Sequence, residues 1–333
     1  MTKNLTLRET AEFLKTHDDY LILTHRRPDG DTVGSAAALC RALRALGKRA
    51  GIYPNPQLTP KFAPFHEGLT DWNTGDGSLC SGTQITVPCV PCVPCVLSVD
   101  VASRNLFPFG MEQAEVALAI DHHGTNSGFA ACTHSDETRA ACGEILVELL
   151  PLLGVTMDKA MADALYTAIS TDTGCFRYAN VTANTFRCAA VCAEAGADVF
   201  QINRVFFETK RMARLRLEAY LTEHMEFFAG GRVALSAIPN ALMDELGLTE
   251  DDVDDISGFG RTIEGVQIAA MLREVENGLG KLSLRTGPEY SAAKICAKLG
   301  GGGHPGAAGA SVPGGIPGVR AALLDALREE IEL

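Results

Sequence analysis

Short apolar runs alternate with helical patterns along the first half of the chain. Four runs of strand length contain few polar side chains, at residues 21–24, 50–53, 96–99 and 117–120. Apolar side chains recur at helical spacing before, between and after them, at residues 7–14, 35–46 and 158–169. Because parallel strands that are buried on both faces are apolar throughout, the pattern predicts an α/β domain with a parallel sheet and helices on both faces.

Residues at the helix ends support this interpretation. Thr6 and Glu9 have the spacing of a capping box at the start of the first helix. Pro28 and Gly30 turn the chain out of the first strand, and Gly47 follows the predicted helix at residues 35–46 as a C-terminal stop. These positions place a loop between the first strand and the helix that follows it.

Groups that bind divalent metal ions follow the strands at their carboxyl ends. Seven residues after the first strand contain His25, Asp29 and Asp31, and Asp100 directly follows another strand. Ligands of open parallel sheets bind at this edge. Two further stretches add donors at a strand end and a helix end, and the complete predicted metal set is His25, Asp29, Asp31, Asp100, His122 and Asp172.

Each stretch alone has a plainer interpretation. Two acids in a Pro-Gly turn usually form a solvated loop, and a histidine at a strand end usually has a structural hydrogen bond. For the full set the alternative is an inert acidic cluster, but buried carboxylates without partners are costly. The recurrence of donors at four stretches therefore favours a metal site.

The second half of the chain has a different pattern. A charged helical pattern at residues 196–223 predicts a connecting helix, and three further strands are expected, at residues 232–237, 266–272 and 281–284. A glycine run at residues 300–303 is expected to be a flexible loop whose N–H groups can approach a phosphate. The planar guanidinium group of arginine suits phosphate, so two arginines of this half are expected to join the glycine run in binding an anion. The predicted anion pocket comprises Arg261, Arg285, Gly302, Gly303 and His304.

Composition narrows the class of protein. The 333 residues are enough for two domains, and the net charge of −12 argues against binding of long nucleic acid. The 11 cysteines follow no secreted framework, which predicts a reduced cytoplasm, and no apolar run is long enough to cross a membrane. A Pro-Cys run contains Cys89, Cys92 and Cys95, a spacing that resembles a metal site. A tetrahedral site needs a fourth ligand, which the run lacks, so we expect an extended segment instead.

In order and spacing, these stretches resemble the motifs of the DHH phosphoesterase superfamily, in its RecJ-like branch of NrnA-like oligoribonucleases and pAp phosphatases. The four matching motifs are His-Arg-Arg-Pro-Asp-Gly-Asp at residues 25–31, Asp100, Asp-His-His-Gly-Thr-Asn at 121–126 and Thr-Asp-Thr-Gly at 171–174. Residues 261–266, 281–285 and 300–309 resemble the associated DHHA1 substrate-binding domain. The resemblance implies a catalytic domain at residues 1–195, a helical linker at 196–225 and a smaller α/β DHHA1 domain at 226–333.

The resemblance also implies roles for the site residues. One divalent ion would be held by His25, Asp29 and Asp100, and a second by Asp31, Asp100, His122 and Asp172. Manganese suits these mixed donors, with magnesium, cobalt or zinc as alternatives. Asp100 would be shared, His123 would contact the phosphate and Asp121 would orient a neighbouring histidine.

The implied function is hydrolysis of short oligoribonucleotides to 5′-mononucleotides, with pAp as a further substrate. Cyclic dinucleotides or pApA are alternative substrates of the same chemistry, and family II inorganic pyrophosphatases share the four motifs but lack the glycine run. A nucleotide-binding sensor without catalysis is an alternative of another class. The resemblance is compatible with a homodimer.

Overall fold

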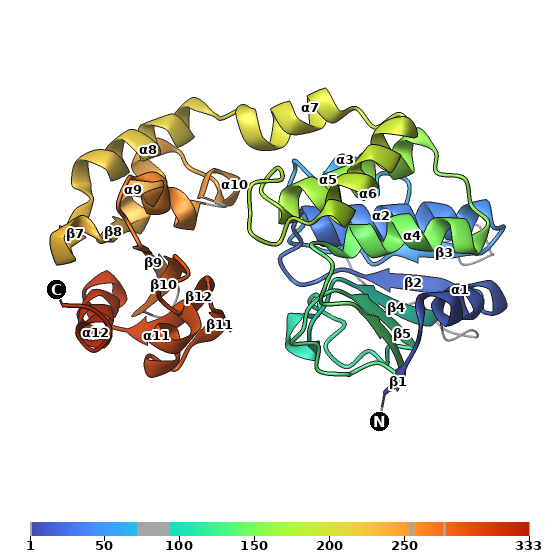
Figure 1. The fold of residues 1–333 in the computed structure, drawn as a ribbon, viewed down its shortest axis with the longest axis horizontal. Coiled ribbons are helices and arrows are strands. Elements are labelled where there is room, and N and C mark those ends of the chain that lie inside the picture. The colour runs from blue at the N-terminus through green and yellow to red at the C-terminus, as the bar shows by residue number, and fades with distance from the viewer. Residues whose placement is uncertain (1, 72–93, 254–255, 276–277, 333) are drawn as a thin grey trace. The chain divides into compact units, whose positions relative to one another are not determined.

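Two six-stranded sheets organise the chain, one in each of two compact units, Met1–Thr209 and Lys210–Leu333 (Figure 1). The computed structural model describes residues 2–71, 94–253, 256–275 and 278–332. The prediction of an α/β fold with a parallel sheet and a second, smaller α/β domain is confirmed. The Pro-Cys run at Cys89 and Cys92 lies outside the described residues.

The first sheet is parallel throughout, with the strand order β1-β6-β5-β4-β2-β3. Its strands are β1 (Lys3–Asn4), β2 (Tyr20–Leu23), β3 (Ala50–Ile52), β4 (Cys95–Val99), β5 (Leu118–Asp121) and β6 (Cys132–Ser135). The chain passes from β2 to β3 on one side, and then returns to place β4 on the other side of β2. The carboxyl ends of β2 and β4 therefore flank the point where the winding direction reverses, which is where open α/β sheets bind ligands.

Alternate residues of these strands pack into different cores. Tyr20 and Ile22 of β2 join the large core that the helices share, whereas Leu23 packs on the opposite face with Phe107 and Val116. The helical segments of this unit are α1 (Leu7–Thr16), α2 (Gly30–Ala45), α3 (Ala63–His66), η1 (Arg104–Leu106), α4 (Cys142–Leu153), α5 (Lys159–Asp172), α6 (Ala183–Glu194), α7 (Val199–Asn203) and the π-helical η2 (Arg204–Glu208). The loops around η1 cover the second face of the sheet.

Two helix starts test the sequence patterns. The capping box of Thr6 and Glu9 is present at the start of α1, as predicted. Helix α2 begins at Gly30, whereas the apolar pattern placed its start at Ser35. Asp29 is the N-cap, so its neighbour Asp31 lies within the first turn of the helix. The pattern failed here because the first turn carries small and polar residues that serve the site.

The second unit contains a mixed sheet with the order β11-β12-β10-β9-β8-β7, in which only the β8–β9 pair is parallel among the described strands. Its elements are α8 (Met212–His224), β7 (Glu226–Phe228), η3 (Ala229–Gly231), β8 (Val233–Ile238), α9 (Asn240–Leu246), α10 (Glu250–Val253), η4 (Ile256–Thr262), β9 (Ile268–Val275), β10 (Leu279–Thr286), α11 (Ala292–Lys298), β11 (Gly302–His304), β12 (Ala307–Pro313) and α12 (Gly315–Arg328). Helices α11 and α12 bury one face of this sheet.

Two sequence expectations need correction in this region. The predicted connecting helix at residues 196–223 is divided into α7, η2 and α8, and the boundary between the two units falls in the break between η2 and α8. The glycine run is only partly a loop, because Gly302 and Gly303 form the edge strand β11 with β12. None of the helices in the described ranges has the length and apolar character needed to cross a membrane.

Candidate metal centre

Strand ends and helix termini of the first unit bring the six predicted metal ligands together. His25 follows β2, Asp100 follows β4, and His122 follows β5. The N-cap and the first turn of α2 contribute Asp29 and Asp31, respectively, and the last residue of α5 is Asp172. Among the residues that the structure describes, three groups each have donor atoms that all lie within 4.8 Å of one another, and they are His25/Asp29/Asp100, Asp31/His122/Asp172 and Asp100/His122/His123.

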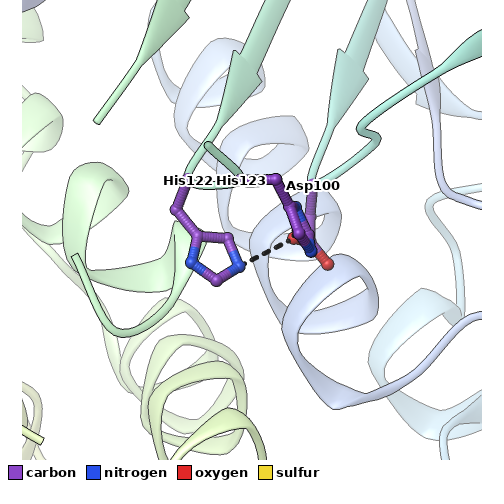
Figure 2. Close-up of side chains that lie close together, drawn as sticks. All are labelled: Asp100, His122 and His123. Atoms are coloured by element: carbon purple, nitrogen blue, oxygen red, sulfur yellow. Dashed lines mark ion pairs between the residues drawn. The ribbon is translucent and has the colours of Figure 1, made fainter. Parts of the chain in front are cut away.

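Asp100 lies at the centre of this arrangement. Its Oδ2 atom is 3.7 Å from Nε2 of His25, and its Oδ1 atom is 3.3 Å from Nε2 of His122. Figure 2 shows Asp100 beside the two adjacent histidines, His122 and His123. Asp100 is buried, and its Oδ1 atom accepts no hydrogen bond from the described residues. A buried carboxylate oxygen that accepts no hydrogen bond fits a metal ligand, since a bound cation would compensate for its burial.

The backbone of Asp100 is also unusual. Its φ angle is 58°, in the left-handed region that few residues other than glycine adopt. Its N–H group donates to the carbonyl of Ile120 in the neighbouring strand, at 2.9 Å. The strand hydrogen bonding therefore continues up to the N–H of Asp100, and the left-handed turn at this residue places its carboxylate at the site.

Asp31 is held by the start of a helix far away in the sequence. Its side chain is buried and accepts the backbone N–H groups of Cys142 at 2.6 Å and Gly143 at 2.9 Å, at the beginning of α4. Ser35, one turn further along α2, donates its hydroxyl to the same carboxylate at 3.1 Å. The positive end of α4 and these donors stabilise the ionised carboxylate.

Close packing of α2 on α5 brings Asp172 into the site. A Cβ atom on Gly30 would lie 2.2 Å from the side chain of Thr171, and one on Gly34 would lie 2.1 Å from the carbonyl oxygen of Ala164. The two glycines therefore allow the helix axes to approach more closely than alanines would. As a result, Oδ2 of Asp172 lies 3.6 Å from Nε2 of His122, as does Oδ2 of Asp31.

Asp121 lies behind the histidines rather than among the six predicted ligands. It is buried, and its Oδ1 atom is 2.8 Å from Nδ1 of His123 and accepts the backbone N–H of His122. Asn126 donates to its other oxygen at 2.5 Å. These contacts fix both the turn after β5 and the ring of His123.

Negative charge dominates the electrostatics of the site. Burial, and then the neighbouring carboxylate of Asp31, raise the pKa of Asp100 well above its usual range. Burial also raises the pKa of Asp172, again with a contribution from Asp31. Burial alone would lower the pKa of His122, but the carboxylates of Asp31 and Asp172 outweigh it and raise this pKa. The protein therefore concentrates carboxylates that repel one another, an arrangement that bound divalent cations would neutralise.

The predicted phosphate-binding residues lie in the second unit. Arg285 of β10 is paired with Ala307 of β12, and Ala307 is paired with His304 of β11. Directly paired residues point to the same face of a sheet, so Arg285 and His304 share a face on either side of a small side chain. Arg261 in η4 donates to the carbonyl of Val266 at 2.6 Å, and its guanidinium lies beside Gly287, just beyond β10.

Several groups that hold the site were missed in the sequence. The N–H groups of Cys142 and Gly143 and the carbonyl of Arg139 act through the main chain, so their side-chain identities carry no signal. The helix α4 itself was detectable, because an apolar run over residues 142–153 ends at Gly154, which adopts a left-handed conformation with φ 79°. What the sequence hides is the contact between this helix and Asp31.

Comparison with known proteins agrees with this arrangement. Residues 19–169 match the DHH family, N-terminal domain, and residues 230–333 match the DHHA1 domain. The chain is 34% identical over 328 residues to the bifunctional oligoribonuclease and PAP phosphatase NrnA of Thermus thermophilus, covering 98% of this chain and 94% of that protein. The NrnA of Mycoplasma genitalium is 25% identical, with 93% of each chain covered.

Solved structures share the fold. An exopolyphosphatase-related protein from Bacteroides fragilis superposes with a TM-score of 0.78 at 21% identity, covering 97% of this chain and 96% of that chain. RecJ of Thermus thermophilus in complex with Mn²⁺ gives a TM-score of 0.52 at 14% identity, covering 97% of this chain and 55% of RecJ. With both domains matched in order and a relative this similar over nearly its whole length, the chain belongs to the DHH/DHHA1 family of phosphoesterases, among its NrnA-like members.

Proposed function

We propose that this chain is a metal-dependent phosphoesterase that hydrolyses short oligoribonucleotides to 5′-mononucleotides and also converts pAp to AMP. The observation that carries the proposal is the position of Asp100, whose two oxygens face two different histidines in overlapping groups of ligands. The names of the NrnA relatives supply the substrate class.

We assign one divalent ion to His25, Asp29 and Asp100, and a second to Asp31, Asp100, His122 and Asp172. Carboxylate and imidazole donors together suit manganese, with magnesium, cobalt or zinc as alternatives. When bound, such ions neutralise the carboxylates, polarise a phosphate and lower the pKa of water. The buried, unsatisfied Oδ1 of Asp100 supports this assignment.

The chain's own groups would orient the substrate around the ions. Asp121 holds Nδ1 of His123, which directs the other ring nitrogen of His123 toward a phosphate oxygen. Asn126 keeps Asp121 in place from the far side. We therefore assign His123 to phosphate contact, Asp121 to its orientation and Asp100 to the metal ions.

We assign nucleotide binding to the second unit. Arg285 and His304 share one face of its sheet, and Arg261 lies beside the end of the same strand as Arg285. Arginine offers paired donors that match a phosphate. Gly302 on the edge strand β11 leaves room for a ligand to approach the backbone, because a Cβ atom there would meet no atom within 4 Å, whereas the neighbouring Gly303 packs closely against Ala307 and Ala308 of β12.

A substrate panel tests the proposal. The full chain is stripped with a chelator, reloaded with Mn²⁺ and incubated with pAp, pApA, cyclic di-AMP and RNAs of two to about seven nucleotides. We expect stepwise release of mononucleotides from the RNAs, conversion of pAp to AMP, and no turnover in the chelator. Turnover of cyclic di-AMP or pApA alone would favour a dedicated dinucleotide hydrolase, and tight binding without turnover would favour a sensor.

A further inference from the structure

One short segment, residues 136–143, contacts two predicted ligands directly, Asp31 and His122, and is joined to a third, Asp172, through a neighbouring side chain. It runs between β6 and the first turn of α4 and contains no predicted metal ligand. Its last two residues, Cys142 and Gly143, hold the carboxylate of Asp31 through their N–H groups. The carbonyl of Arg139 in this segment contacts His122, and the carbonyl of Ala140 is joined to Asp172 through Asn180.

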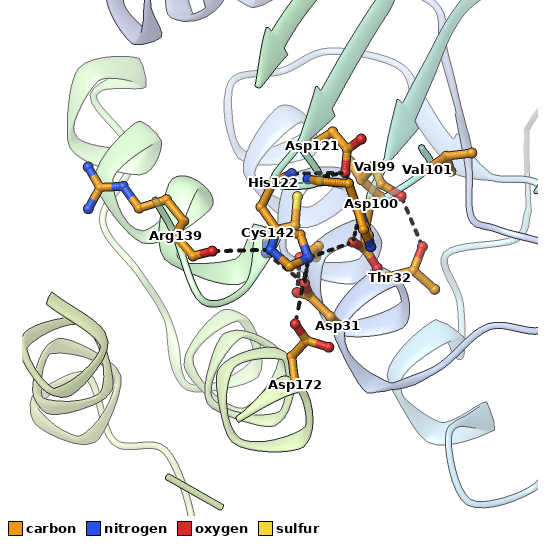
Figure 3. A network of polar contacts seen from close by, with 12 residues as sticks. Asp31, Thr32, Val99, Asp100, Val101, Asp121, His122, Arg139, Cys142 and Asp172 are labelled. Carbon is orange, nitrogen blue, oxygen red and sulfur yellow. Dashed lines mark hydrogen bonds and ion pairs between the residues drawn. The ribbon is translucent and has the colours of Figure 1, made fainter. Parts of the chain in front are cut away.

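The contact with His122 sets the orientation of its ring. Nδ1 of His122 lies 3.2 Å from the carbonyl oxygen of Arg139, so this nitrogen must carry the proton and donate (Figure 3). The opposite nitrogen, Nε2, then faces the carboxylates, at 3.3 Å from Asp100 and 3.6 Å from both Asp31 and Asp172, and is the nitrogen left to bind a metal ion. The carbonyl of Arg139 thus selects the tautomer of His122 that can bind a metal ion.

The side chain of Arg139 fixes the main chain that provides this carbonyl. Its Nε atom lies 2.9 Å from Asp136, and its two terminal nitrogens contact both oxygens of Glu148 in α4, at 2.7 and 3.0 Å. Glu148 is itself held by Asn184 at 3.1 Å, so the guanidinium is anchored to α4 and, through it, to α6. A fork of this kind constrains both position and direction.

Asn180 makes the third connection. Its side-chain N–H₂ group donates to the carbonyl of Ala140 and to the carbonyl of Asp172, each at 3.1 Å. It therefore joins the segment that holds His122 and Asp31 to the end of α5, which carries Asp172. Asn180 is exposed, so its removal takes away these two hydrogen bonds with little loss of buried packing.

We propose that Arg139 and Asn180 are positioning residues that keep His122, Asp31 and Asp172 in the geometry needed to hold divalent metal ions. The inference rests on the metal site assigned under the proposed function. Neither residue is a predicted ligand, so both act through the ligands that they hold. Partners of metal ligands commonly affect metal affinity or activity by 10- to 100-fold, roughly, when they are removed.

Direct measurement of Mn²⁺ binding tests this inference. The full-length chain and its Arg139→Lys and Asn180→Ala variants are stripped of metal and titrated with Mn²⁺ alone, by calorimetry and by the loss of the free Mn²⁺ signal in electron paramagnetic resonance. We expect each variant to bind Mn²⁺ about 10-fold more weakly or worse. At saturating Mn²⁺, KM for a dinucleotide should stay within about twofold of wild type, because neither residue contacts substrate.

A matched control is Arg320→Lys. Arg320 makes a similar fork to Glu226 in the second unit, without contact to a predicted ligand, so its variant should bind Mn²⁺ as wild type does. Circular dichroism and melting temperature show that each variant is folded. Folded Asn180→Ala and Arg139→Lys proteins with wild-type Mn²⁺ affinity would overturn the inference, whereas a wild-type chain that binds no Mn²⁺ would overturn the metal site itself.

Discussion

Gly34 of α2 faces the main-chain carbonyl of Ala164 in α5, so closely that a Cβ atom on Gly34 would lie 2.1 Å from the carbonyl oxygen. The obstacle is backbone, which cannot rotate away as a side chain can. This contact sets the separation of the two helices, and with it the distance from Asp31 at the start of α2 to Asp172 at the end of α5.

The substitution Gly34→Ala should therefore push the two helices apart. We expect it to lower the free energy of unfolding by about 1 to 3 kcal/mol, as overpacking of a core does, and to weaken Mn²⁺ binding as well. Urea denaturation and Mn²⁺ titration measure both effects. Gly258→Ala is a control, because a Cβ there would meet no atom within 4 Å, and its stability should be nearly unchanged. Equal stability of the two variants would contradict the close approach.

Replacing Asp100 with Asn should separate catalysis from stability. Burial and the carboxylate of Asp31 raise the pKa of Asp100 in the folded protein. At neutral pH the unfolded chain ionises this group more readily than the folded one, so the group lowers the stability of the metal-free protein. In a chelator at neutral pH, Asp100→Asn should therefore melt at the same temperature as wild type or higher. Its turnover with Mn²⁺ should fall about 100-fold or more, since a ligand shared by both groups is lost.

Addition of Mn²⁺ provides the complementary measurement for this variant. At about 100 times the dissociation constant, a ligand that binds only the folded state stabilises it by about 2.7 kcal/mol. For a unit of this size we expect wild type to melt about 5 to 10 °C higher with Mn²⁺ than in chelator. Asp100→Asn should lose most of this increase, and an unchanged increase would refute the central place of Asp100.

Arg285→Ala and His304→Ala should affect binding of nucleotides more than the chemistry of phosphate cleavage. Loss of a hydrogen bond from a charged group costs about 1.5 to 3 kcal/mol, so Arg285→Ala should raise KM for pAp or a dinucleotide about 10-fold or more. A minimal substrate such as bis(p-nitrophenyl) phosphate should show a much smaller change. Arg273→Ala serves as the control, because Arg273 lies on the adjacent strand and is paired with Glu250 at 2.9 Å. Equal effects of Arg285→Ala on both substrates would argue against nucleotide binding by this face.

His66 should make the stability of the first unit depend on pH. Burial lowers the pKa of this histidine to about 4, against an opposing hydrogen bond to the carbonyl of Val33. The unfolded chain takes up this proton near pH 6.5 and the folded chain does not, so the contribution is lost as the pH falls from 6.5 toward 4. The loss should approach about 3 kcal/mol. His66→Gln, compared with wild type by urea denaturation in chelator, should show a shallower decline, and parallel pH profiles would contradict the assignment.

The parts of the fold that follow from local patterns were predictable from the sequence. Apolar runs predicted four strands of the first sheet, β2, β3, β4 and β5, and Asp100 and His122 could be placed at the ligand edge because they come at the ends of two of these runs. The fold class followed from the alternation of strands and helices, and the motif resemblance agrees with the domains that the comparisons identify.

The parts that depend on distant contacts were not predictable. The early start of α2 was missed because Gly30 packs against α5 and Asp31 accepts hydrogen bonds from α4, and neither residue belongs to an apolar helix face. Gly302 and Gly303 form a strand because they pair with β12, whereas a run of glycines in the sequence predicts a loop. Arg139 was missed because the group that contacts His122 is its carbonyl, which every residue type possesses.

The left-handed backbone at Asp100 also limits how this enzyme can lose its activity during evolution. With φ at 58°, the position accepts Asn or Gly with little strain, whereas most other side chains, and β-branched ones above all, would strain the turn after β4. A lineage that abandons catalysis by a single change here keeps its fold most readily with Asn or Gly. In an alignment of relatives, Asn or Gly at this position with the other five ligands intact would therefore mark a pseudoenzyme that still folds.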